Sequence, residues 1–489
     1  MERFGIEGER LWKSLLLLGL LLNVLVCFTS DLGLDTQVKM AVNDDGALPW
    51  GDLRPETTGQ SDASDGGERR VLPLYGLSET GIKATALVTF LGLLACLYRW
   101  SGVRSATIFS LSPAMLFSVG RGYEEVYLAV FCSVALLLFS GVLSGKYRAL
   151  QCFFGGICFM AMVYSKGFTT LLGVLLGALF IAAVVLMWHE LQQRQWKGTA
   201  WMARPDVVAI VSGSVVALVM FVFGLLEMNP TLAIIGQEPL RYVSALLFSV
   251  FDLGVLYVLF GMVVWPFVPP VLKGIKESRD ERVAFIAGYI SGIFVALVLY
   301  VAALWTYEAS IWGAEWPGII WTMGNNGRYV TMLYIPLVIL MHQMSKLHSI
   351  PTLDDPKSKL KPMFATILLL LPLSLLASVH GQTMWTDEAA EAMELETNDH
   401  FLFVSEDTLG MHWLYTFYAP LDAEQNNITG HWRSISSQWE SDLNSTLSHV
   451  QVIVTSPDAT LTPLGWDVKH SGESDFLNGK GEWRVLTRS

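Results

Sequence analysis

Two aspartates, Asp31 and Asp35, stand directly after the first long apolar stretch of the chain and could carry out acid–base chemistry. They are four residues apart, so they would share one face of a helix if this segment is helical. Carboxylates held close together raise each other's pKa or share a cation, and a raised pKa suits a general base. The alternative is a solvated loop in which one of the two caps a helix.

A second group of charges lies in the short turn Arg121-Gly-Tyr-Glu124-Glu125, between two further apolar stretches. Charged side chains pinned against a bilayer cost free energy unless they have partners. Glu124 and Glu125 could simply interact with the dipole of the helix that follows. The cost of placing two carboxylates here favours a functional role.

A third group, Gly324-Asn-Asn326-Gly327-Arg328-Tyr329, opens a late apolar stretch. A guanidinium at the start of a helix, beside a glycine-rich turn with free backbone N–H groups, suits a phosphate. Taken singly, such a residue is more often an anchor whose charge reaches the interface. Several cations are expected on the same side of the membrane as Arg328, and their convergence predicts a phosphate site. The expected members of that site are Arg328, Arg121, Lys166, Tyr329 and Asn326.

Long apolar stretches are the elements that must position these residues. A helix needs about 20 apolar residues to cross a hydrocarbon layer of ~30 Å, and we count roughly eleven candidate stretches. They lie near residues 11–29, 81–99, 105–119, 124–143, 149–164, 167–188, 207–226, 245–268, 283–307, 328–345 and 362–380. We therefore predict a polytopic α-helical membrane protein whose transmembrane domain comprises residues 1–380.

Basic residues fall in alternate connections between these stretches. Lys and Arg gather near 10–13, 99–104, 146–148, 194–204, 273–282 and 346–361. Positive charge marks cytoplasmic connections, so the amino terminus is predicted to be cytoplasmic. The loop 30–80, which carries the first acidic motif, and the segment 381–489 are predicted to be external. We expect the first stretch to be an uncleaved anchor rather than a cleaved signal peptide.

The carboxyl-terminal segment 381–489 reads as a small external α/β domain. Its predicted strands are Phe401–Val404, Val450–Val454 and Trp483–Leu486. Ile435, Trp439, Leu443 and Leu447 recur every four residues, which predicts a helix with one apolar face toward the sheet. With no catalytic motif of its own, this domain is interpreted as a recognition or lid element.

Charge is distributed unevenly along the chain. Residues 381–489 contain 17 acidic and 5 basic residues, a balance of −12 that equals the net charge of the whole protein. An acidic external surface implies no nucleic-acid partner. The five cysteines all lie in apolar stretches, so no disulfide framework or cysteine metal site is indicated.

This layout resembles the GT-C superfamily, integral-membrane glycosyltransferases that use polyprenyl-phosphate sugars. Asp31 and Asp35 match the position of the family's first acidic motif. The turn 121–125 is most similar to dolichyl-phosphate-mannose-dependent mannosyltransferases, and Gly327–Leu337 resembles the start of a late span in bacterial and archaeal members. The family's first acidic pair is usually Asp-Glu or Asp-x-Asp, so the wider spacing here leaves open which aspartate is catalytic.

The resemblance implies that a sugar, a hexose such as mannose, passes from a polyprenyl-phosphate donor to an acceptor hydroxyl on the external face. Asp35 would be the catalytic base, with Asp31 as the second catalytic candidate and Asp45 as a more distant rival. Glu124 or Glu125 would orient the acceptor or a cation. The departing lipid phosphate would be neutralised by Arg328, helped by Arg121 and Lys166.

The partners implied are the lipid-linked donor, membrane lipid, and an acceptor that is a glycan, a lipid or a protein. The transfer implied is metal-independent or weakly metal-assisted, and in the second case Mg²⁺ or Mn²⁺ would be held by Asp31, Asp35 and Glu124. The chain ends without a retention signal, which favours the plasma membrane over the endoplasmic reticulum. The alternative function is a transporter or flippase for a lipid-linked or acidic solute. Transporters usually keep ionisable residues inside their spans, and here Asp252 is the main one.

Overall fold

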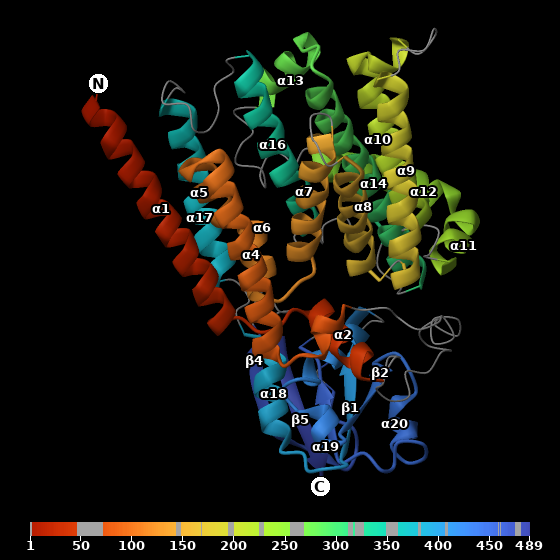
Figure 1. Ribbon diagram of the computed structural model, residues 1–489. Coiled ribbons are helices and arrows are strands. Elements are labelled where there is room, and N and C mark those ends of the chain that lie inside the picture. The colour runs from red at the N-terminus through yellow and green to blue at the C-terminus, as the bar shows by residue number, and fades with distance from the viewer. Residues whose placement is uncertain are drawn as a thin grey trace. The chain divides into compact units, whose positions relative to one another are not determined.

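The computed structural model describes most of the chain, as two compact units (Figure 1). The described residues are 2–45, 72–142, 148–167, 169–193, 200–223, 229–254, 268–311, 316–317, 327–348, 360–379, 383–405, 409–457, 459, 461–474 and 481–489. One unit, called the membrane unit below, comprises the described parts of 1–28, 84–304 and 321–378. The other, called the sheet unit, comprises the described parts of 29–83, 305–320 and 379–489.

The membrane unit is helical. Its elements are α1 (Glu2–Thr29), α4 (Glu79–Ser101), α5 (Val103–Ser110), α6 (Pro113–Gly120), α7 (Glu125–Val142), α8 (Arg148–Ser165), α9 (Leu171–Gln193), η2 (Ala200–Ala203), α10 (Pro205–Phe223), α11 (Asn229–Gln237), α12 (Pro239–Phe251), α13 (Val268–Glu277), α14 (Glu281–Ile311), η7 (Gly327–Val330), α16 (Thr331–His348) and α17 (Leu360–Val379). Among the described residues, seven of these helices are long and apolar enough to cross a membrane: α1, α4, α7, α8, α9, α10 and α14. The predicted polytopic helical architecture is confirmed.

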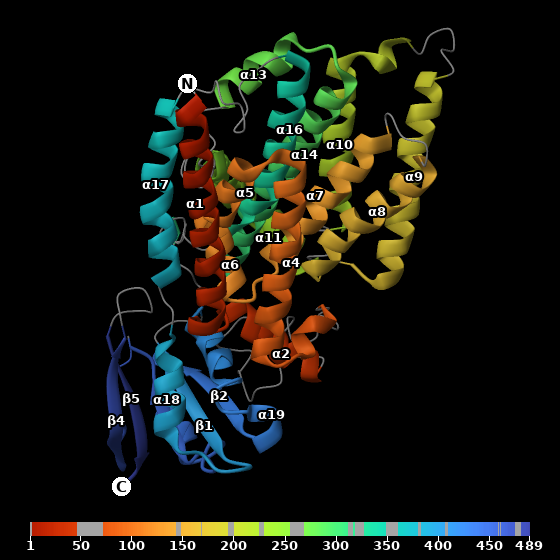
Figure 2. The same ribbon diagram turned by 60° about the vertical axis from the view of Figure 1, so that its left-hand side comes forward.

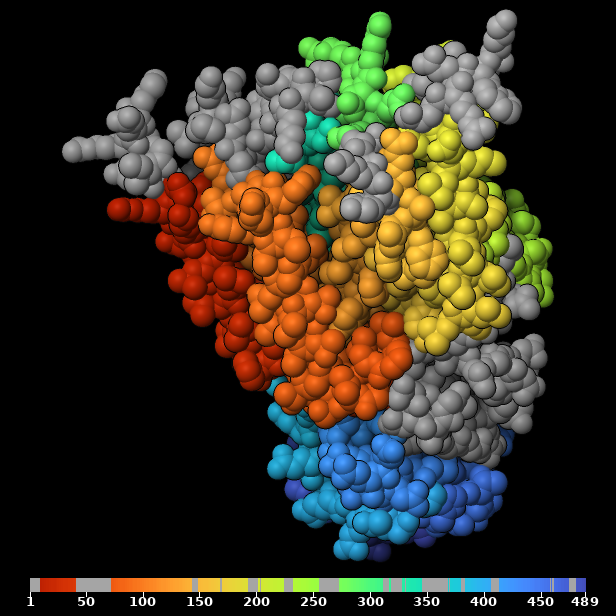
Figure 3. All heavy atoms as spheres, in the orientation of Figure 1, coloured from red at the N-terminus to blue at the C-terminus, as the bar shows by residue number. Residues whose placement is uncertain are grey.

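The outer surface of α9 shows what surrounds this unit. In both ribbon views α8 and α9 run side by side (Figure 2). Helix α9, in the yellow region of Figure 3, exposes large apolar side chains. They are Leu171, Leu172, Leu175, Leu176, Leu179 and Phe180. An apolar surface of this extent is unfavourable in water but suits hydrocarbon. The protein is therefore an integral, multi-pass membrane protein.

Four of the predicted spans are divided, shifted or only partly described in the structure. The predicted span 105–119 is wrong, because α5 and α6 are separate helices interrupted at Ser112, whose φ and ψ of −61° and 121° are extended. Pro113 explains the break, since a proline disfavours helical geometry in the preceding residue and has no N–H to donate. The predicted spans 328–345 and 362–380 correspond to α16 and α17, and the second part of 245–268 lies outside the described residues.

Helices α10 and α14 approach each other closely through glycines. A Cβ atom on Gly288 of α14 would lie 2.1 Å from Ser212 Oγ and 2.3 Å from the carbonyl oxygen of Ala209, both on α10. A Cβ on Gly213 would lie 2.9 Å from the carbonyl oxygen of Gly288. Small residues permit this backbone contact in membrane helices, so the two helices pack as one wall.

The sheet unit contains a five-stranded mixed sheet in the order β2-β1-β3-β5-β4. The strands are β1 (His400–Ser405), β2 (Thr429–Ser434), β3 (Val452–Thr455), β4 (Trp466–Ser474) and β5 (Gly481–Arg488). The helices are α2 (Leu34–Asp45), η1 (Pro73–Gly76), α18 (Trp385–Met393), η8 (Leu409–Phe417), α19 (Ala423–Asn426) and α20 (Trp439–Asp442). Strands β1, β2 and β3 are parallel, whereas β5 is antiparallel to β3 and β4.

Apolar side chains cover both faces of this sheet. On one face, Phe401 and Phe403 pack with Trp385 of α18 and with Val38 of α2. The segment after the first apolar helix is therefore joined to the carboxyl-terminal sheet. On the other face, Leu402 and Val404 pack with the residues that follow β2.

The three predicted strands are present, but the predicted helix over Ile435–Leu447 is mostly wrong. Only Trp439–Asp442 is helical, and turns follow it. Trp439, Leu443 and Leu447 nevertheless pack on the sheet as the apolar stripe predicted. Strands β2 and β4 were not predicted, since β4 has mostly exposed polar residues and lacks an apolar pattern.

Candidate functional site

The predicted acidic turn and phosphate-binding residues meet at one end of the membrane unit. Glu124 and Glu125 stand at the start of α7, and Lys166 directly follows α8. Arg328 and Tyr329 lie in η7, before α16. Three segments distant in sequence thus place their charged residues together.

Two glycines, Gly122 and Gly167, allow tight turns beside these charged residues. Gly122 has φ of 65°, a left-handed conformation that favours glycine, and the N–H of Tyr123 donates to the carbonyl of Ser118 at 2.9 Å. Gly167, with φ of 76°, ends the turn after α8. Its N–H donates to the carbonyl of Tyr164 at 2.8 Å. Both turns therefore hold their charged neighbours at fixed positions.

Ion pairs connect the four charged side chains. Lys166 Nζ contacts Glu124 Oε1 and lies 3.3 Å from Glu125 Oε1. Arg328 Nε lies 3.1 Å from the same Glu125 oxygen. Glu124, Glu125 and Arg328 are between 0% and 4% exposed. Since removing one partner of a buried ion pair costs about 3–5 kcal/mol, these residues depend on one another.

Aromatic rings extend the cationic group. The Arg121 guanidinium lies over the Phe117 ring at 4.1 Å, and the Arg328 guanidinium over the Tyr123 ring at 4.2 Å. Phe117 and Tyr123 stack on each other, with ring centroids 5.7 Å apart. A cation–π contact uses the face of the guanidinium, so the N–H groups at its edge can still donate hydrogen bonds. The sequence did not predict the roles of Phe117 and Tyr123.

Two tyrosines complete the cluster beside Lys166. Lys166 Nζ donates to the Tyr329 hydroxyl at 3.3 Å, which lies 3.5 Å from the hydroxyl of Tyr300 on α14. Burial alone would lower the pKa of Lys166, but Tyr329 and Glu125 raise that pKa above its ordinary value, so the amine stays charged. With Arg121 and Arg328 there are three cations against two carboxylates. Among the described side chains named here, cations therefore outnumber carboxylates by one.

An apolar pocket opens directly beside this cluster. It has an empty volume of about 610 Å³, and three of its lining residues are polar: Lys166, Tyr300 and Tyr329. The remainder of the lining is apolar and comes mainly from α7, α8, α10 and α14, with residues such as Leu128 and Met220. A pocket that is apolar along its walls and cationic at one end suits an amphiphilic anion.

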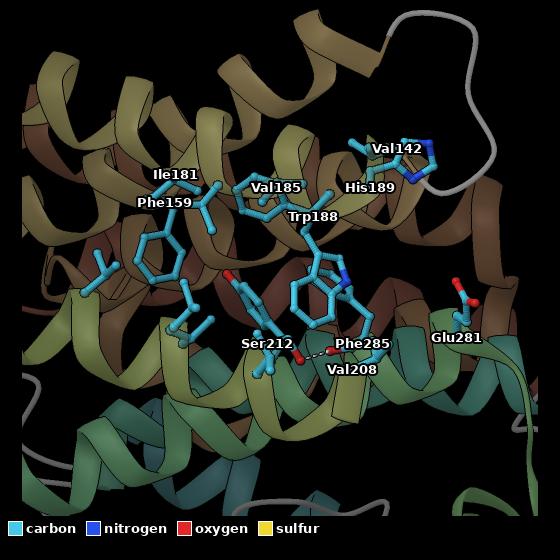
Figure 4. Close-up of a pocket in the computed structure, with 17 residues that line it drawn as sticks. Val142, Phe159, Ile181, Val185, Trp188, His189, Val208, Ser212, Glu281 and Phe285 are labelled. Carbon is cyan, nitrogen blue, oxygen red and sulfur yellow. Dashed lines mark hydrogen bonds between the residues drawn. The ribbon is translucent and has the colours of Figure 1, made fainter. Parts of the chain in front are cut away.

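A second pocket is lined by residues of α7, α8, α10 and α14 as well, and also of α9 (Figure 4). It has an empty volume of about 860 Å³ between α7, α8, α9, α10 and α14, and its lining is nearly all apolar. Val219 of this pocket is adjacent on α10 to Met220 of the first. On α14 the two pockets are lined from Glu281 to Tyr300, which at 1.5 Å per residue is about 28 Å, close to the thickness of a bilayer's hydrocarbon core.

A different carboxyl pair forms in the sheet unit. Asp31 and Asp387 hydrogen-bond to each other, and the Met384 N–H donates to Asp31 Oδ2. Burial raises the pKa of Asp31, and burial and Asp31 together raise the pKa of Asp387 to about 8. Lys83 lies nearby and donates to the carbonyl of Ser30. At neutral pH the two carboxyls therefore share a proton.

Asp31 and Asp35 do not share a helical face, contrary to the sequence expectation. Helix α2 begins at Leu34, after Gly33, whose carbonyl accepts the N–H of Thr36 at 2.9 Å. Asp35 lies half-buried in the first turn, whereas Asp31 precedes the helix and turns toward α18. Asn326 and the side chain of Asp45 lie outside the described residues.

Asp387 and Tyr300 are two further residues of these clusters that the sequence did not predict. Asp387 stands in an ordinary acidic run, and only the fold brings it to Asp31. Tyr300 offered a weak signal, because it is a polar aromatic near the end of an otherwise apolar predicted span. Arg241, a further cation of this sequence, forms an ion pair with Glu238 at the start of α12.

Comparisons with known proteins gave few matches. No protein-family model matches the chain, and no curated protein matches it. Two crystal structures of ArnT from Cupriavidus metallidurans are similar in structure. The structure bound to undecaprenyl phosphate has 12% identity and a TM-score of 0.46, with 97% of each chain covered. The apo structure has 12% identity and a TM-score of 0.43, with 99% of this chain and 98% of that chain covered.

Proposed function

We propose that this protein is a glycosyltransferase of the GT-C type that uses a polyprenyl-phosphate sugar. The observation that supports this most strongly is the pocket whose apolar walls end at Lys166, Tyr300 and Tyr329. A polyprenyl chain would occupy the apolar part, between helices α7 and α8 on one side and the wall of α10 and α14 on the other. Its phosphate would reach Lys166 and Arg328, where the named cations outnumber the carboxylates.

The charge in this cluster fits the chemistry of the leaving group. The acceptor oxygen attacks the anomeric carbon, the bond from that carbon to the phosphate oxygen breaks, and its electron pair stays on the phosphate. Negative charge on the phosphate therefore grows in the transition state, and cations already held in place lower the barrier. Arg328 and Lys166 would perform this role, and Arg121 would add to the field.

The acceptor hydroxyl also has to lose a proton. The carboxylates after α1, Asp35 or Asp31, are our candidates for the base. Burial gives Asp31 a raised pKa, which is a property of a general base. Glu124 and Glu125 already have partners in Lys166 and Arg328. We therefore propose that these two acids hold the cations in position, in addition to orienting the acceptor.

We propose a transfer that needs no divalent metal. Mg²⁺ or Mn²⁺ would act by neutralising the phosphate, and Lys166 and Arg328 supply positive charge for that purpose. Of the three acids considered as metal ligands, Asp31 hydrogen-bonds to Asp387 and Glu124 contacts Lys166. The remaining parts of the proposal are a hexose donor such as mannose, an acceptor on the external face, a cytoplasmic amino terminus and a plasma-membrane location.

One residue favours transport as the second candidate function. Asp252, at the end of α12, is 1% exposed, and its carboxylate oxygens have no hydrogen-bond partner among the described residues. A buried carboxylate inside a membrane protein often marks an ion or proton pathway. A transporter, however, consumes no sugar donor in detergent, where no gradient exists.

The experiment is therefore donor turnover by the purified full-length protein in detergent, with a short-chain polyprenyl-phosphate hexose and a panel of acceptors. We expect release of polyprenyl phosphate, strongly reduced in Arg328→Lys, because an ammonium cannot make the two-point contact of a guanidinium. Arg241→Lys is the matched control and should retain turnover. If no donor is consumed, yet vesicles containing the protein move a lipid in an Arg328-dependent way, the protein is a transporter.

A further inference from the structure

Three histidines meet at one edge of the sheet unit. His400 begins β1 and His431 lies in the neighbouring strand β2 (Figure 2). His431 is paired with Leu402 across the parallel strands, and His400 is two residues before Leu402. Side chains at these positions project from the same face of the sheet. The fold therefore sets two imidazoles side by side.

The third histidine, His449, belongs to the segment that packs on this face of the sheet. Leu443 and Leu447 pack against Leu402 in the core on this face, and His449 follows two residues later. The chain then enters β3, which lies beside β1. His431 is buried, His400 is half-buried and His449 is exposed, so the cluster opens to solvent on one side.

The distances between the ring nitrogens match those of metal ligands. His431 Nε2 lies 3.2 Å from His400 Nδ1 and 3.4 Å from His449 Nε2, and one nitrogen from each ring lies within 4.8 Å of the others. Zinc binds imidazole nitrogen at about 2.0–2.1 Å. In a tetrahedron of that size two ligands are about 3.3 Å apart, which agrees with both of these distances.

Hydrogen bonding alone accounts poorly for this arrangement. A neutral imidazole nitrogen has either one proton or one lone pair, directed in the plane of its ring. His431 Nε2 faces two other nitrogens, and the ring of His449 is inclined to those of His400 and His431 by 88° and 72°. A single proton on His431 can be directed at only one of these neighbours. A metal ion accepts a lone pair from all three.

We propose that His400, His431 and His449 form a zinc-binding site, in which a water molecule or a further ligand takes the fourth position. Imidazole suits zinc, copper and nickel, whereas magnesium and manganese prefer oxygen. The site would connect β1, β2 and the segment before β3. It is separate from the sugar-transfer chemistry proposed above, and its existence does not depend on that function.

The test is zinc binding by the full-length protein, purified in detergent without a polyhistidine tag and stripped with a chelator. Zinc is titrated in competition with a coloured chelating indicator. We expect one tightly bound equivalent in the wild type. His449→Gln should weaken binding by at least about tenfold, the loss typical even of a partner that only orients a ligand. His470→Gln, an exposed histidine of β4, is the matched control and should bind as the wild type does.

Two further measurements distinguish loss of the metal site from loss of the fold. His449 is exposed, so its substitution should leave the fold intact, and the melting temperature without metal should equal that of the wild type. Cobalt added in place of zinc should give the visible absorption bands of a tetrahedral site, absent in His431→Gln. The proposal is overturned if the wild type binds no stoichiometric zinc, or if binding is unchanged in His449→Gln.

Discussion

The proton shared by Asp31 and Asp387 should make the sheet unit less stable as the pH rises. Burial first, then Asp31, raises the pKa of Asp387 from 3.8 to about 8 in the folded protein; Glu79 adds to this and Lys83 opposes it. The folded state thus binds the proton more tightly than the unfolded chain does. The stability from this proton is complete below the unfolded pKa and is lost as the pH rises from 3.8 through about 8.

Asp387→Asn removes this dependence, because an amide cannot titrate but still donates to Asp31. Between about pH 5 and pH 7.5 the wild type loses about 3 kcal/mol, at about 1.4 kcal/mol per pH unit. Asp387 is only partly buried, so screening by water reduces this to about 2 kcal/mol. In a unit of this size that is a difference of about 4–8 °C in melting temperature.

The assay is thermal unfolding of the full-length protein followed by tryptophan fluorescence. Trp385, two residues from Asp387, stacks with Trp483 at 6.2 Å and should report the melting of this unit. The melting temperature of Asp387→Asn minus that of the wild type should increase from pH 5 to pH 7.5. Glu388→Gln, the exposed neighbour, should show no such increase. A constant difference for Asp387→Asn at both pH values would refute the shared proton.

Three further outcomes are expected. Gly288→Leu should lower the melting temperature of the membrane unit, because even its Cβ would lie 2.1 Å from Ser212 Oγ; unchanged unfolding would contradict the close contact of α10 and α14. Arg433→Met should cost about 3–5 kcal/mol, measured by chemical denaturation, because it leaves Asp442 without the buried partner whose Nε lies 2.9 Å from Asp442 Oδ2. The further change Asp442→Leu should restore much of that loss. Sugar transfer should persist in the presence of a chelator, and its complete loss followed by recovery with Mg²⁺ would contradict a metal-free mechanism.

Patterns within short segments allowed much of the fold to be predicted. Apolar length identified the spans, and the apolar stripe through Trp439, Leu443 and Leu447 identified the cover of the sheet. The predictions went wrong where local geometry overrides composition. Pro113 divides a stretch that is apolar throughout, and the stripe after β2 is carried mainly by turns.

The charged residues of the candidate site could be picked out from the sequence, because an unpaired charge near a membrane is unfavourable. Glu124, Glu125 and Arg328 stood out because each needs a partner. Arg328 pairs directly with Glu125, and Lys166 pairs with both carboxylates. The partner of Asp31 could not be predicted, since Asp387 lies 356 residues further along and has nothing unusual in its own segment. The three histidines have no motif spacing for the same reason, as three separate segments supply them.

The central claim is that a lipid phosphate binds at Lys166 and Arg328 with its chain in the pocket lined by α7, α8, α10 and α14. The most direct test is a polyprenyl phosphate that carries a photoreactive group in its chain, crosslinked to the purified protein and mapped by mass spectrometry. We predict crosslinks to pocket residues such as Met220 and Leu297, displaced by unlabelled polyprenyl phosphate and lost in Arg328→Ala. Crosslinks confined to the exposed surface of α9, or unaffected by Arg328→Ala, would contradict it.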